Sequence, residues 1–219
     1  MVGESIGSGQ DALLLHAGGE TRAVWRPVMT RLAPHGLRSI AFDQRGHGES
    51  NGSPADGVIA YGDDAKAMIE QLNRPIVVGA SLGGFALMLA LENAGKHVAG
   101  LVLVDVTPAP NAARARAYLA PRGGLGASPI VEDILARADM MTRRVSQLRL
   151  PIMLVCAGKP SPLHDDDREH FLSIAPHASI RTLDKAGHLI ARDAPDDLAD
   201  LIAEFARNLS VNQTSTNPD

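Results

Sequence analysis

Short, mostly apolar runs alternate with longer and partly polar segments along most of the chain. Such runs are typical of strands buried on both faces of a sheet; they cover residues 12–15, 37–42, 76–78, 98–104, 152–155 and, more weakly, 180–183. Helical patterns lie between them, near residues 22–34, 61–73, 82–95, 165–175 and 195–208. The alternation predicts an α/β fold in which a mostly parallel sheet carries helices on both faces.

The stretch from residue 108 to residue 150 interrupts this alternation. It contains prolines, a Gly-Gly pair and several arginines but no clear strand, which indicates an insertion of one or two short helices between two strands. We therefore expect a single domain over residues 1–209 with an insertion at about 106–150. Residues 210–219 are polar and lack periodicity, so we expect a disordered tail there.

Composition and charge narrow the class of function. The chain has 219 residues, 45% of them hydrophobic, and a formal net charge of −4 without a long run of either sign. This balance argues against a nucleic-acid partner or a membrane surface bound through charge, and no apolar run approaches the roughly 20 residues that cross a bilayer. With a single cysteine and no pattern of an export signal, we expect a cytoplasmic protein.

A serine lies in the pattern G-x-S-x-G at residues 79–83, directly after one apolar run and before a helix-forming run. In this context a sharp strand-to-helix turn presents the serine hydroxyl at its tip, and small residues must flank it. The N-terminus of the following helix favours a developing negative charge. We predict that Ser81 is the nucleophile of a serine hydrolase.

A histidine and a glycine-containing loop supply the other expected parts of such a site. His188 follows the last strand run and comes after the serine in chain order, so we predict that it is the general base and then the general acid. The segment HAGG at residues 16–19 follows the first strand run and can aim a backbone N–H at the serine. We expect the N–H groups of Gly18 and Leu82 to form an oxyanion hole.

Four segments together resemble the α/β-hydrolase superfamily, in particular its small bacterial esterase, lactonase and haloperoxidase-like members. They are LLLHAGG at 13–19, FDQRGHGES at 42–50, VGASLGG at 78–84 and AGHLI at 186–190. The resemblance implies an α/β-hydrolase fold, here with a shortened N-terminus and a short lid formed by the insertion. It also implies that Asp43, Arg45 and His47 shape a loop and take no part in the reaction.

The resemblance leaves open the carboxylate that would complete a Ser-His-acid triad. The family usually places this acid three residues after a glycine, a position that Ser161 occupies here. One candidate is Asp105, at the end of the strand run 98–104, where some members of the superfamily carry their acid. The other candidates also suit the first turn of a helix; they are Asp165, Asp166 and Asp167. A dyad without an acid is a third possibility.

The insertion is short for a lid in this family, which suggests an open pocket or one that another subunit of a homo-oligomer completes. Arginines are frequent in it, among them Arg114, Arg116, Arg122, Arg137, Arg143 and Arg144. Such residues either favour an anionic substrate or lie on solvated helix faces, and the sequence leaves both interpretations open.

Together these features predict the hydrolysis of a carboxylic ester, thioester or lactone. The small-molecule substrate would form an acyl-enzyme on Ser81, with His188 as the base and Asp105 as its partner. This chemistry requires neither a metal nor an organic cofactor. Two alternatives stay open: a hydrolase-like binding or receptor protein with weak turnover, motivated by the vacant acid position, and cleavage of a C–C bond by the same residues.

Overall fold

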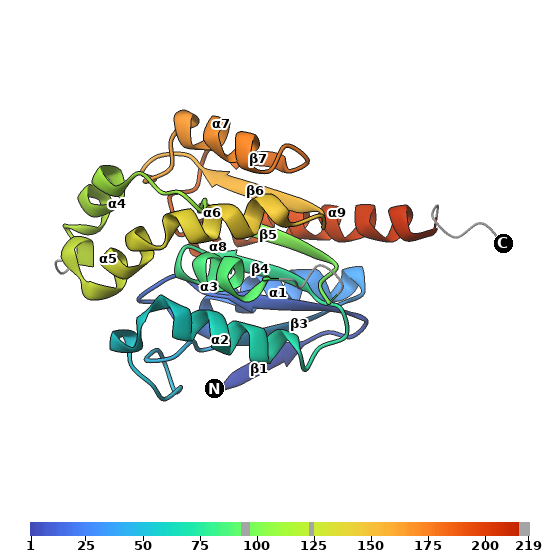
Figure 1. Cartoon of the computed structure of the whole chain (residues 1–219). Coiled ribbons are helices and arrows are strands. Elements are labelled where there is room, and N and C mark those ends of the chain that lie inside the picture. Colours follow the sequence, from blue (N-terminus) through green and yellow to red (C-terminus); the bar gives the residue numbers. More distant parts are fainter. Residues whose placement is uncertain (93–96, 123–124, 215–219) are drawn as a thin grey trace.

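A seven-stranded sheet runs through the centre of the computed structural model, which describes residues 1–92, 97–122 and 125–214 (Figure 1). Its strands are β1 (Gly3–Ile6), β2 (Gln10–Leu15), β3 (Leu37–Phe42), β4 (Ile76–Ala80), β5 (Gly100–Val104), β6 (Ile152–Ala157) and β7 (Ser179–Leu183). The order across the sheet is β1-β3-β2-β4-β5-β6-β7, and every neighbouring pair is parallel except β1 with β3. The prediction of a mostly parallel α/β sheet is confirmed.

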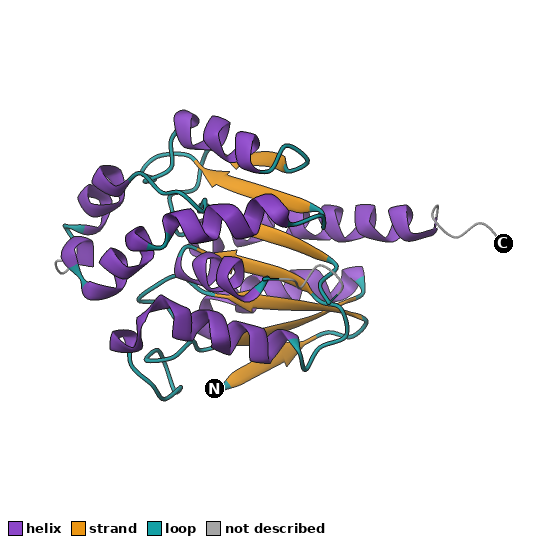
Figure 2. Ribbon diagram, viewed as in Figure 1, coloured by secondary structure: helices purple, strands orange, loops and turns teal. Residues whose placement is uncertain are grey.

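Helices cover both faces of the sheet (Figure 2). They are α1 (Arg26–Leu32), α2 (Gly57–Ile69), α3 (Leu82–Ala90), α4 (Ala112–Leu119), α5 (Pro129–Ala136), α6 (Ala138–Gln147), α7 (Asp165–Ile174), α8 (Ile190–Asp193) and α9 (Pro195–Thr214). The C-terminal end of α9 projects beyond the sheet (Figure 1). No helix in the described ranges is long and apolar enough to span a membrane.

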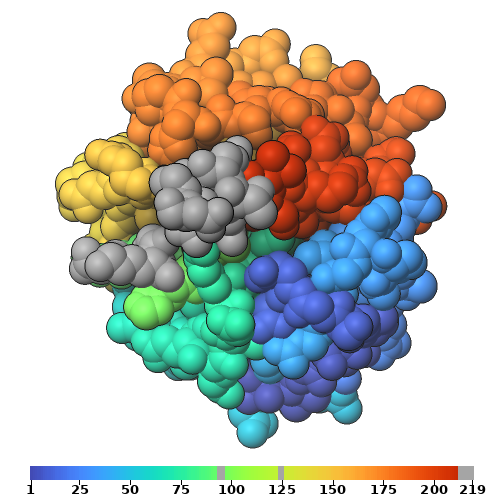
Figure 3. Space-filling view, turned by 90° about the vertical axis from the view of Figure 1, so that its right-hand side faces the viewer, coloured from blue at the N-terminus to red at the C-terminus, as the bar shows by residue number. Residues whose placement is uncertain are grey.

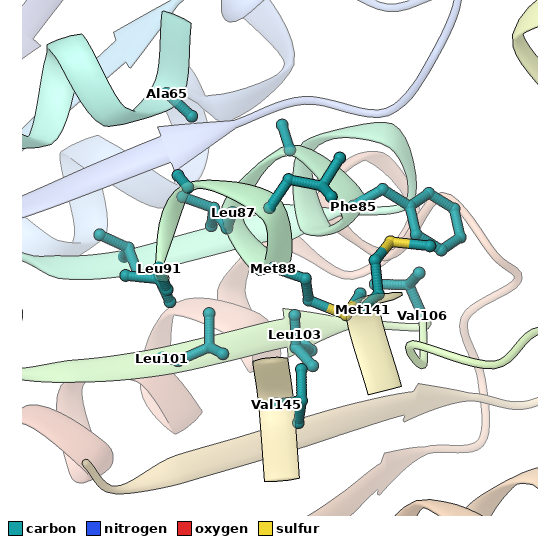
Figure 4. Close-up of a cluster of buried hydrophobic side chains, with 14 of the residues drawn as sticks. Ala65, Phe85, Leu87, Met88, Leu91, Leu101, Leu103, Val106, Met141 and Val145 are labelled. Carbon is teal, nitrogen blue, oxygen red and sulfur yellow. The ribbon is translucent and has the colours of Figure 1, made fainter. Parts of the chain in front are cut away.

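Alternate residues of each central strand point to opposite faces of the sheet. In β2, Leu13 and Leu15 belong to one hydrophobic cluster with residues of α2, α3, α6 and α7, whereas Leu14 belongs to a second cluster with residues of α1, α8 and α9. Figure 4 shows part of the first cluster, where side chains of α3 and α6 pack together, among them Phe85 and Met141. Burial on both faces explains why the strands are apolar at consecutive positions.

The common direction of the parallel strands places the candidate site at one end of the molecule. Figure 3 shows the end at which α9 projects, with the N-terminal residues on one side of α9 and the region of α7 and β7 on the other, as expected for the two edges of the sheet. The carboxyl ends of the parallel strands lie at the opposite end, together with α4 and α5 (Figure 1). In sheets of this kind, ligands bind beyond the carboxyl ends of the strands.

Departures from the sequence prediction include an edge strand, the insertion and the C-terminal tail. β1 was not predicted, because its residues alternate between exposed and half-buried positions at the sheet edge. The described residues of the insertion between β5 and β6 form three α-helices, α4 to α6, where one or two were expected. The expectation of a disordered tail is wrong for residues 210–214, since α9 continues to Thr214 and extends a helix whose inner face is buried at Ile202 and Leu209.

Two sequence expectations fall partly outside the described residues. The predicted helix over 82–95 corresponds to α3, which ends at Ala90, and residues 93–95 lie outside the described ranges. Residues 215–219 of the expected tail also lie outside them.

Candidate active site

Ser81 lies in the turn between β4 and α3. Its backbone has φ 47° and ψ −109°, in the positive-φ region that residues other than glycine seldom occupy. A Cβ on Gly79 would come within 2.6 Å of the backbone at residues 83 and 84, and a Cβ on Gly83 would come within 2.3 Å of the carbonyl oxygen of Leu15. These close approaches explain both glycines of the G-x-S-x-G pattern and hold the serine at the tip of a tight turn.

His188 lies in the loop between β7 and α8, and its ring faces Asp105. Nδ1 of His188 is 2.7 Å from Oδ2 of Asp105. The backbone N–H of His188 donates to the carbonyl oxygen of Pro160 at 3.0 Å, so both the ring and the backbone are held in place. When Nδ1–H donates to the carboxylate, the lone pair of Nε2 is left on the far side of the ring, where it can accept a proton.

Asp105 directly follows β5 with φ 52°, and its side chain is completely buried. Its Oδ1 accepts the backbone N–H of Ala157 at 2.9 Å. Its Oδ2 accepts the hydroxyl of Ser161 at 2.6 Å, in addition to the bond from His188. Buried carboxylates need such partners, because an unpaired charge away from water is costly. Thus the serine that occupies the family's usual acid position donates to the carboxylate that contacts the histidine.

The other three acidic candidates lie in the first turn of α7 and pair with arginines instead. They are Asp165, Asp166 and Asp167. The latter two share Arg114, at 2.9 and 2.6 Å. Of the four candidate acids, it is Asp105 whose carboxylate contacts the histidine.

The two residues expected to form the oxyanion hole are neighbours in space. A Cβ on Gly18 would lie 3.7 Å from Cδ2 of Leu82. Leu82 is the first residue of α3, and the first N–H groups of a helix have no acceptor within it. The next N–H, that of Gly83, donates to the carbonyl oxygen of His16 at 3.2 Å and ties the loop to the helix N-terminus. The arrangement suits two N–H groups aimed at a developing negative charge.

Two histidines hold the glycine-containing loop at residues 16–19. Nε2 of His16 accepts the backbone N–H of Gln44 at 3.1 Å, and Nδ1 lies 2.8 Å from a neighbouring backbone carbonyl oxygen. Burial lowers the pKa of His16 to about 4, which keeps the ring neutral, as these two bonds require. Nε2 of His47 accepts the N–H of Gly19 at 3.1 Å. His47, which was expected to shape the loop after its own strand, therefore supports the loop at residues 16–19.

A cavity of about 620 Å³ brings all five predicted site residues together. They are Gly18, Ser81, Leu82, Asp105 and His188. Its walls are mainly apolar, and many of them come from α4, α5 and the adjoining loops. A volume of this size suits a small molecule. Within the described residues, no group of three or more His, Cys, Asp or Glu side chains is arranged to hold a metal ion.

Three further residues of the cavity make contacts that the sequence did not predict. His47 lines it as well as supporting the loop. The ring of Tyr118, on α4, lies 5.1 Å from the ring of His188 in an edge-to-face arrangement. The guanidinium carbon of Arg122 lies 3.9 Å from the centre of the Tyr118 ring. The sequence carries no signal for these contacts beyond the arginine content of the insertion, since long-range packing creates them.

Comparisons with known proteins agree with this architecture. A family model described as alpha/beta hydrolase fold matches residues 13–125. The chain is 38% identical over 136 residues to a protein of Variovorax paradoxus provisionally named carbamate hydrolase RutD, covering 55% of this chain and 50% of that protein. It is 33% identical over 106 residues to a pimeloyl-[acyl-carrier protein] methyl ester esterase of Shewanella woodyi, covering 48% and 39%. The matches thus span half or less of these relatives.

A solved structure extends the likeness in fold to almost the whole chain. The esterase from Thermogutta terrifontis aligns with a TM-score of 0.75 at 22% identity, covering 95% of this chain and 93% of that one. At this level of identity the likeness shows the fold alone.

Proposed function

This chain belongs to the family with the alpha/beta hydrolase fold, and we propose that it is a serine hydrolase for a carboxylic ester, thioester or lactone. The hydrogen bond of 2.7 Å between His188 and Asp105, in the cavity that Ser81 also lines, carries the proposal. The names of two relatives, a carbamate hydrolase and a methyl ester esterase, support hydrolysis at an acyl carbon.

In the proposed reaction, Oγ of Ser81 attacks the carbonyl carbon of the substrate while Nε2 of His188 takes the hydroxyl proton. Asp105 holds the histidine in the required tautomer and stabilises its charged form. The histidine then gives the proton to the departing alcohol, thiol or ring oxygen. Water, activated by the same histidine, attacks the acyl-enzyme and releases the acid.

The negative charge that develops on the carbonyl oxygen needs donors already in place. We assign this role to the backbone N–H groups of Gly18 and Leu82. Within the described part of the chain, no hydrogen bond joins the hydroxyl of Ser81 to His188. In free enzymes this bond is often long, and it shortens when substrate binds.

A fluorophosphonate probe tests the proposal without knowledge of the substrate. We expect stoichiometric labelling of the folded protein, with the adduct on the peptide that contains Ser81. Ser81→Ala abolishes the labelling, whereas Ser173→Ala, which removes an exposed hydroxyl on α7, retains it. Absence of labelling in folded protein would contradict the proposal and favour a binding or receptor protein. A panel of p-nitrophenyl esters and lactones then separates the substrate classes.

A further inference from the structure

The cavity contains an arginine that no carboxylate neutralises within the described residues. Four of the seven arginines in the insertion form ion pairs; they are Arg114, Arg116, Arg137 and Arg144. Arg143 and Arg149 are exposed and do not line the cavity. Arg122 lines the cavity, and the contacts of its guanidinium in the described part of the chain are the ring and the carbonyl oxygen of Tyr118. Its positive charge is thus left without a counter-charge from the described residues.

The acidic groups that line the same cavity are already engaged. The carboxylate of Asp105 is bound by His188, Ser161 and a backbone N–H. The carboxylate of Asp167 is bound by an arginine of α4 and by a backbone N–H. Neither is available to a ligand or to Arg122, so the charge that the cavity offers to a substrate is positive.

We propose that Arg122, stacked on Tyr118, binds an anionic group of the substrate, and that this group is a carboxylate joined to the scissile bond through an apolar chain. The inference rests on the proposed hydrolase activity and assigns a substrate class to the same cavity.

The geometry relates this subsite to the reacting atoms. The guanidinium carbon of Arg122 is 3.9 Å from the centre of the Tyr118 ring, and that centre is 5.1 Å from the centre of the His188 ring. The guanidinium carbon therefore lies no farther from the centre of the His188 ring than these two distances added together. A short chain of methylene groups spans such a distance, and the mainly apolar cavity wall suits it.

The chemistry of the pair favours a carboxylate ligand. Stacking on the aromatic face orients the planar guanidinium. Its Nη1 donates to the carbonyl oxygen of Tyr118, and within the described residues Nε and Nη2 are left free to donate to a ligand. Two parallel N–H donors match the two oxygens of a carboxylate, a geometry that a lysine ammonium does not reproduce. Arg122 is also exposed, so it lies where the cavity meets solvent. Water therefore weakens the interaction, and a selectivity of about tenfold is expected, well below that of a fully buried pair.

The test uses two matched pairs of esters, so that the position of the anion is also resolved. For the acyl side, the mono-p-nitrophenyl ester of adipic acid is compared with its methyl ester. For the alcohol side, the butyrate ester of 4-hydroxybenzoic acid is compared with the butyrate ester of methyl 4-hydroxybenzoate. The quantity measured is the ratio of kcat/KM for the charged ester to that for its uncharged partner, from release of the phenol.

We expect Arg122→Gln to lower this ratio about tenfold in one of the two pairs, and Arg122→Lys to restore only part of it. Arg143→Gln is the matched control, because it removes an exposed arginine outside the cavity, and it leaves the ratio unchanged. A ratio that Arg122→Gln leaves unchanged in both pairs, in protein that hydrolyses the uncharged esters, overturns the subsite alone. If the parent protein hydrolyses none of the esters and a fluorophosphonate fails to label Ser81, the hydrolase proposal fails instead.

Discussion

Replacing Asp105 by asparagine keeps the shape of the side chain and removes its charge. Oδ1 can still accept the N–H of Ala157, which it now accepts at 2.9 Å. The amide nitrogen then faces His188 and Ser161, which both donate to Oδ2 in the parent protein. Because two donors cannot bond to each other, the histidine must accept from the amide at Nδ1 and carry its proton on Nε2. In that tautomer it cannot take the proton of Ser81.

The expected loss is about ten thousand-fold in kcat, the scale seen when a triad acid is replaced by its amide. At about 1.4 kcal/mol per factor of ten, this corresponds to roughly 5.5 kcal/mol of lost transition-state stabilisation. The fold should be little affected, since the amide keeps acceptors for its hydrogens in Ser161 and His188. A shift in Tm within about 4 °C is expected for a chain of this length.

The assay is the steady-state release of p-nitrophenol from p-nitrophenyl butyrate, with Ser81→Ala as the background. A second variant separates loss of chemistry from loss of structure. The double variant Asp105→Ala/Ser161→Asp places a carboxylate at the position of the Ser161 hydroxyl. In the parent protein this hydroxyl lies 2.6 Å from the carboxylate of Asp105. The double variant should recover at least about tenfold in kcat over Asp105→Ala alone. If Asp105→Asn stays within a few-fold of the parent, the assignment of Asp105 is refuted.

Three further predictions concern the groups around the triad. Ser161→Ala removes a donor from the Asp105 carboxylate, so kcat should fall about tenfold; an unchanged kcat would show that the hydroxyl does not act through Asp105. Gly79→Ala places a methyl group 2.6 Å from the backbone of α3, so the free energy of unfolding measured in urea should fall by at least about 2 kcal/mol. In Gly18→Ala the methyl group meets no atom closer than 3.7 Å, and the loss should be far smaller. Equal losses would contradict the packing argument. His16 has a pKa of about 4 in the folded protein and about 6.5 in the unfolded chain, so the free energy of unfolding should fall by up to about 3 kcal/mol as the pH drops through this window. His16→Gln should reduce this dependence of the unfolding free energy on pH. An unaltered slope would show that His16 does not cause the dependence.

Much of the fold could be predicted because the central strands are buried on both sides. β2, β4, β5 and β6 have almost wholly buried residues and stand out as apolar runs. β1 has no such pattern, since it pairs on one side only and exposes half of its residues. The end of α9 was also missed. Its last turns are polar, and they are helical because they continue the buried turns before them.

The site was predictable where one local motif determines the geometry. The strand-to-helix turn at Ser81 follows from two glycines and an apolar run. The partner of His188 could not be decided in the same way, because Asp105 and the acidic residues of α7 all follow strand ends or open helices. The contacts of Tyr118 and Arg122 could not be predicted for a different reason, since only the packing of α4 over the strand ends brings these residues to the histidine. The catalytic roles of these residues stay predictions.

The central claim is that an acyl group is carried by Ser81, and trapping this intermediate tests it most directly. Mixing the protein with excess p-nitrophenyl ester, quenching in acid within the first turnover and measuring intact and peptide masses should reveal one acyl group per chain. The adduct should lie on the peptide that contains Ser81 and be absent from Ser81→Ala. Hydrolysis without any adduct on the approach to steady state, or an adduct on another residue, would contradict the proposed mechanism.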